Sequence, residues 1–91
     1  MIFQGSVEIE WNDGRAYYLT GKNKNKNFVI NCMRSFIETN LDEDSIEALN
    51  LDEMTDRLEV QPLKVSAMRI IGTIYGTISV NVCVFGFSEE Y

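Results

Sequence analysis

Residues 77–87 read Thr-Ile-Ser-Val-Asn-Val-Cys-Val-Phe-Gly-Phe, and this stretch decides the fold class. Large apolar residues occupy one side of its period-two repeat, namely Ile78, Val80, Val82 and Val84. Small or polar residues occupy the other side, namely Thr77, Ser79, Asn81 and Cys83. Such alternation predicts a β-strand with one face in the core and the other turned toward water.

The N-terminal part of the sequence predicts a β-hairpin. Val7, Ile9 and Trp11 alternate with glutamates, which is typical of a half-buried strand. Asn12-Asp13-Gly14 follows and indicates a turn, because glycine tolerates a positive φ. Residues 15–20 are rich in residues that suit a pleated sheet, and we expect them to form the returning strand.

Two further strands are expected after the middle of the chain. Residues 58–60 alternate between apolar and charged side chains, which favours a short strand. Residues 64–74 form a longer apolar segment, and Tyr75-Gly76 marks the turn that leads into residues 77–87.

The segment between these strands predicts helices. Residues 21–27 hold alternating lysines and asparagines, and we expect a solvated, mobile loop. Asn27 is a suitable N-cap for a helix over residues 28–39. Its apolar stripe has three- and four-residue spacing and consists of Phe28, Val29, Cys32, Met33, Phe36 and Ile37. The acids at 42–44 mark another helix start, and Asn50 indicates that two short helices follow.

Together these elements predict one α+β domain over residues 1–91. The expected order is β-β-α-(α)-β-β-β, an antiparallel sheet of four to five strands with one or two helices on one face. Matching periodicities place the valines of the last strand against the first helix. The expected core contacts join Val80, Val82 and Val84 with Val29, Met33 and Phe36.

Composition argues against catalysis and metal binding. The 91 residues include no histidine, the commonest general base and metal ligand. Cys32 and Cys83 lie among apolar neighbours, and we expect two reduced, buried thiols. Asp42, Asp44 and Glu53 match three positions of a calcium loop, but Glu47 stands where glycine is required. We therefore expect no enzyme activity, cofactor or metal, and a cytoplasmic location without membrane contact.

The charge distribution is the strongest indication of function. The net charge is −6, and residues 38–59 hold nine of the fourteen acidic residues against one arginine. As one helix this segment would be ~33 Å long, and its net −8 approaches one DNA strand. The predicted partner-binding residues are its exposed acids, namely Glu38, Asp42, Glu43, Asp44, Glu47, Asp52, Glu53 and Asp56.

These observations favour a protein-binding module that meets a basic surface and does not itself bind nucleic acid. Small acidic domains without motifs are typical of phage inhibitors of nucleic-acid-handling complexes, such as anti-restriction and anti-CRISPR proteins. A second hypothesis is an assembly module that forms a homodimer through an exposed strand edge. A third is a nucleotide sensor that uses the lysines of residues 21–27.

Four aromatic residues offer a further surface for binding. Trp11, Tyr17, Tyr18 and Tyr75 are candidates for base stacking or for a protein-binding hot spot. Aromatic residues in strands also form cross-strand pairs in the core. Tyr17 and Tyr18 are neighbours, so they point to opposite faces of the predicted strand.

Overall fold

The computed structural model describes residues 1–60 and 64–88. Its strands and helices are β1 (Ile2–Trp11), β2 (Ala16–Asn23), α1 (Lys26–Asn40), α2 (Glu43–Leu49), α3 (Leu51–Val60), β3 (Lys64–Thr73) and β4 (Gly76–Phe87). The order β-β-α-α-α-β-β confirms the predicted α+β class.

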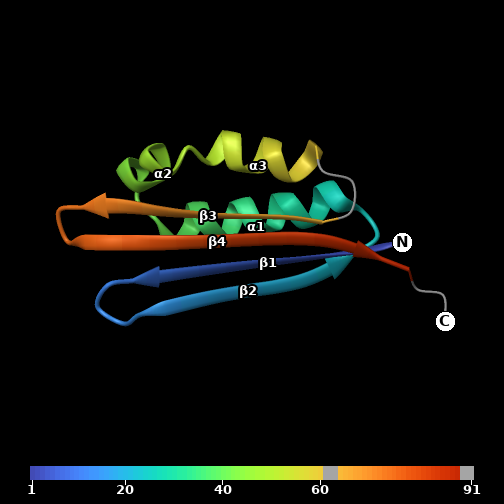
Figure 1. Cartoon of the computed structure of the whole chain (residues 1–91), viewed down its shortest axis with the longest axis horizontal. Helices are drawn as coiled ribbons and strands as arrows, with labels where there is room; N and C mark the ends of the chain where they lie inside the picture. Colours follow the sequence, from blue (N-terminus) through green and yellow to red (C-terminus); the bar gives the residue numbers. More distant parts are fainter. Residues whose placement is uncertain (61–63, 89–91) are drawn as a thin grey trace.

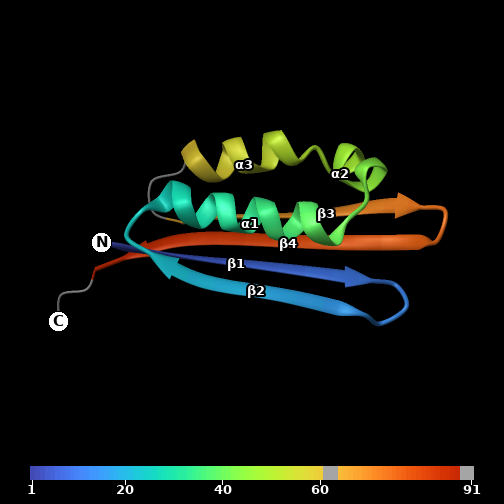
Figure 2. The same ribbon diagram turned by 180° about the vertical axis from the view of Figure 1, so that it is seen from behind.

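The four strands form one antiparallel sheet in the order β2-β1-β4-β3. Two hairpins supply it, and their inner strands β1 and β4 pair with Val7 opposite Val82 and Ile9 opposite Val80. All three helices lie on the same side of this sheet, as the two opposite views show (Figures 1 and 2). The other side, which we call the open face, carries no layer of the described chain.

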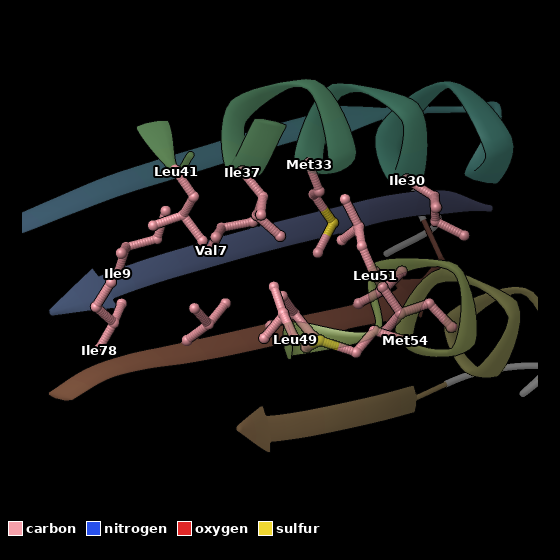
Figure 3. Close-up of a cluster of buried hydrophobic side chains, with 14 of the residues drawn as sticks. Val7, Ile9, Ile30, Met33, Ile37, Leu41, Leu49, Leu51, Met54 and Ile78 are labelled. Atoms are coloured by element: carbon pink, nitrogen blue, oxygen red, sulfur yellow. The ribbon is translucent and has the colours of Figure 1, made fainter. Parts of the chain in front are cut away.

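The core lies between the helices and the covered side of the sheet (Figure 3). Ile9, Val80, Ile37 and Leu49 are each at most 1% exposed. The β4 valines share one buried cluster with Val29 and Met33 of α1, as predicted, whereas Phe36 is only half-buried at the margin of this cluster. On the sheet, the helix itself packs mainly against β1 and β2. The helices α2 and α3 also contribute to this core, through their buried side chains Leu49, Leu51, Met54 and Leu58.

Gly5 allows α1 to approach β1 closely. A Cβ built at this position would lie 2.5 Å from Cγ1 of Val29 and 2.6 Å from Sδ of Met33. Both distances are shorter than real carbon contacts allow. The small residue at position 5 therefore sets the distance between the helix layer and the sheet.

The first helix begins earlier than the sequence predicted. Asn25, and not Asn27, is the N-cap, and its side-chain oxygen accepts a hydrogen bond from the Phe28 amide at 3.2 Å. Because β2 continues to Asn23, the predicted loop over residues 21–27 shrinks to residues 24–25. Five extra residues thus join the regular structure of the sheet and helix.

The predicted strand at residues 58–60 is wrong, because these residues form the last turn of α3. Leu58 packs into the core at the helical spacing set by Leu51 and Met54. The expected division into two short helices is confirmed. Asn50 separates them in the left-handed conformation, with φ of 56°, and ends α2.

The prediction of two buried thiols is wrong. Cys32 is exposed on α1, since the buried stripe of this helix is Val29, Ile30, Met33 and Ile37. Cys83 is half-buried and belongs to the open face, opposite Ser6. Both cysteines are free, and the sheet separates them, which excludes an intramolecular disulfide in this fold.

Candidate functional site

Arg34 neutralises two of the predicted partner-binding acids. From α1 it donates to Glu38 at 2.8 Å and to Thr55 at 3.1 Å, and it also pairs with Asp52. The hydrogen bonds that Arg34 donates to Asp52 and Glu38 raise the pKa of Arg34. Glu38 and Asp52 therefore serve a link between α1 and α3.

Glu53 is engaged in the same way. Its carboxylate lies 3.0 Å from a guanidinium nitrogen of Arg69 on β3 and 3.6 Å from one of Arg57. Asn50 also donates to it at 2.7 Å. Three of the eight predicted partner-binding residues, Glu38, Asp52 and Glu53, thus form ion pairs within the fold. Sequence spacing alone did not reveal these pairs.

The acids of α2 have a different setting. Asp42 caps the helix by accepting from the Ser45 amide at 2.8 Å, and hydrogen bonds from Ser45 lower the pKa of Asp42. Glu43, Asp44 and Glu47 are exposed, and none of them forms an ion pair with a residue of 1–60 or 64–88. Their negative charge is therefore available to a partner.

Asp56, the last of the eight, is exposed on α3 and likewise has no ion pair in the described part of the chain. The segment 38–59 is divided among three helices, so the interpretation of this segment as one helix ~33 Å long is wrong. The structure thus disperses the acids instead of lining them up like a strand of DNA.

A hollow of about 580 Å3 lies beside α2. Its walls are the helix residues Asp42, Asp44, Ser45 and Ala48 and the β3–β4 turn with Gly72, Thr73, Ile74 and Tyr75. The helix and the turn lie side by side at one end of the molecule (Figures 1 and 2). Two carboxylates thus stand next to a turn that carries large apolar side chains.

The turn presents these side chains fully to solvent. Ile74 is 91% exposed and Tyr75 is 85% exposed. Thr73 holds the turn, because its hydroxyl donates to the Gly76 carbonyl at 2.8 Å and accepts from the Tyr75 amide at 3.1 Å. We call Asp42, Asp44, Ile74 and Tyr75 the turn site.

The three lysines of residues 21–27 do not all lie on one side of the sheet, although Lys24 and Lys26 line the same open hollow. Lys22 lies on the open face, with Nζ 5.7 Å from the ring centre of Phe87. Lys26 lies on the helix side, where Nζ donates to the Glu59 carbonyl at 3.3 Å. The sheet separates the amino groups of Lys22 and Lys26, so the nucleotide hypothesis stays a prediction that rests on Lys24 and Lys26.

The four candidate aromatics also occupy separate places. Trp11 and Tyr17 pack edge to face with ring centres 5.0 Å apart, and Arg15 lies over Trp11. Tyr18 is on the open face, whereas Tyr75 belongs to the turn site. They therefore form no continuous stacking surface.

Comparisons with protein-family models, with curated proteins and with solved structures found no significant match. Among the described residues, no helix has both the length and the apolar character required to cross a membrane. Within residues 1–60 and 64–88, no group of three or more Cys, Asp or Glu side chains is arranged to hold a metal ion.

Proposed function

We propose that this chain is a protein-binding module and that the turn site binds a basic segment of its partner. The observation that carries the proposal is the hollow in which Asp42 and Asp44 stand beside the exposed Tyr75. An apolar side chain of the partner would rest against the tyrosine ring. Neighbouring lysine or arginine residues would face the two carboxylates.

The chemistry of the site favours a protein over a nucleic acid. Exposed carboxylates repel phosphates, whereas tyrosine is enriched among residues that dominate protein interfaces. Glu43 and Glu47, which form no ion pair within residues 1–60 and 64–88, extend the negative potential around the site. Such a potential steers a basic partner and raises the association rate. Nucleic-acid-handling complexes, whose grooves are basic, remain the partner class that this proposal favours.

The test starts with proteins that the immobilised chain captures from an extract of its native host. Each captured protein is purified, and its affinity is measured against the wild type and three variants. We expect Tyr75→Ala and the pair Asp42→Asn with Asp44→Asn each to weaken binding by about tenfold or more. Asparagine still caps a helix, so the second variant preserves α2.

The matched control is Asp52→Asn with Glu53→Gln, which removes the same formal charge from acids already paired with arginines. It should leave the affinity within about threefold, since exposed ion pairs contribute little to stability. The association rate of the wild type should fall as salt rises. Unchanged affinity in both site variants would contradict the proposal.

A further inference from the structure

The open face of the sheet has an ordered distribution of charge and size. Cross-strand register arranges its side chains in rows that run across the strands. At one end is the lysine row, made of Lys22, Gln4, Phe85 and Lys64. Toward the other end is the glutamate row, made of Ala16, Glu10, Ser79 and Ile70. The two ends therefore carry opposite charge.

Two more rows lie between these ends and differ in size. The small row is made of Thr20, Ser6, Cys83 and Ser66. The large row is made of Tyr18, Glu8, Asn81 and Met68. A shallow groove of about 320 Å3 runs between Tyr18 and Met68, and its floor includes Ser6 and Cys83. The face is thus raised along one row and lowered along the next.

Large apolar side chains on this face have no cover within the described chain. Tyr18, Met68 and Ile70 are 64%, 61% and 64% exposed. They belong to both edge strands, β2 and β3, so they flank the face on two sides. Uncovered apolar surface of this kind, with charged residues at its ends, is typical of protein–protein contact.

We propose that two copies of the chain pack their open faces together about a two-fold axis that lies between the sheets and runs across the strands. This axis reverses the strand direction and passes between the small and large rows. It places the glutamate row of one copy over the lysine row of the other. It also seats each large row on the partner's small row, so the faces interlock.

The geometry permits such a contact. Sheets that pack face to face lie ~10 Å apart, a distance that lysine and glutamate side chains span together. Four strands over about eight residues give a footprint of roughly 500 Å2 per copy. This area lies near the lower end of specific interfaces, so we expect a dimer that forms in the micromolar range.

Charge reversal provides the test, with sedimentation velocity across micromolar concentrations as the readout. Lys22→Glu with Lys64→Glu makes the whole face acidic, whereas Glu8→Lys with Glu10→Lys makes it basic. We expect the wild type to dimerise and each double variant to be monomeric. An equimolar mixture of the two variants should form dimers again, which a variant that failed to fold would not do.

The two thiols supply a second readout on the wild-type protein. Cys83 lies in the small row and should become protected from a thiol reagent as the concentration rises into the dimer range. Cys32 is exposed on α1, outside the proposed contact, and should react at a constant rate. It serves as the internal reference.

Three results would overturn the proposal. These are a wild type that stays monomeric throughout the micromolar range, double variants that dimerise as the wild type does, and a dimer in which Cys83 remains as reactive as in the monomer. The turn-site pair Asp42→Asn with Asp44→Asn should leave dimerisation unchanged. The dimer and the proposed partner binding can therefore fail independently.

Discussion

The two sides of the sheet come from alternate residues of the same four strands, yet their environments differ greatly. Ile9 is fully buried under the helices, while its neighbour Glu10 is exposed on the open face. On β3, Ile70 is 64% exposed but Ile71 is only 7% exposed. Burial on the covered side thus fixes the fold, whereas the open side has no layer of the described chain to pack against.

The largest effect should come from truncating the covered side. Ile9→Ala removes a side chain with no exposed surface and should cost about 2–5 kcal/mol of unfolding free energy. Asn81→Ala on the open face is the control and should change stability by less than about 0.5 kcal/mol. Urea denaturation measures the unfolding free energy of both variants, at a protein concentration too low for self-association. Equal midpoints for the two variants would contradict the contrast between the faces.

A smaller effect should follow from overfilling the gap between α1 and β1. Gly5→Ala places a methyl group within 2.6 Å of Val29 and Met33 side-chain atoms, and overpacking should cost about 1–3 kcal/mol. Gly21, its cross-strand partner, has no atom within 4 Å of the corresponding position. Gly21→Ala should therefore be nearly neutral. The thermal midpoints of the two variants provide the comparison, and equal loss in both would refute the close approach at Gly5.

The smallest effect concerns a carboxylate pair on the open face. A hydrogen bond with Glu10 raises the pKa of Glu8 above its ordinary value of 4.5, with burial and charge repulsion adding to the shift. A raised pKa in the folded state gives stability that is present below the ordinary value and is lost as pH rises through the folded-state value.

Glu8→Gln removes this loss of stability with rising pH, because glutamine does not ionise. The variant should therefore gain stability relative to the wild type as pH rises from below 4.5 to neutrality. Urea midpoints of both proteins at the two ends of this range measure the difference, again at high dilution. A difference that stays constant or shrinks with rising pH would show that the carboxylates do not interact in this way.

Sequence periodicity predicted the sheet and the first helix because long repeats distinguish a period of two from one of 3.6. Residues 58–60 are too few to make this distinction, so the end of α3 was mistaken for a strand. In α1 the buried stripe is rotated toward Ile30, which brought Cys32 into solvent. The sequence did not show that rotation, since Phe28 and Cys32 continue the apolar spacing.

The candidate site was predictable only in part. The acidic residues of α2 were apparent from composition, and Tyr75 was one of four candidate aromatics. The acids of α2 and Tyr75 lie close together because α2 packs beside the β3–β4 turn, and no local sequence pattern encodes this packing. The ion pairs of Arg34 with Asp52 and of Arg69 with Glu53 also join distant segments, so the neutralised acids were indistinguishable from the free ones.

The pairing of β1 with β4 has a consequence for how the chain is made. Synthesis delivers β1 first and β4 last, although these strands are neighbours at the centre of the sheet. The hairpin of β1 and β2 is at best marginally stable by itself in water. Joining it to β4 closes the longest loop of any strand pair in the sheet, which has the largest entropic cost. On the ribosome, Val7 and Ile9 therefore wait for their valine partners until β4 has been synthesised.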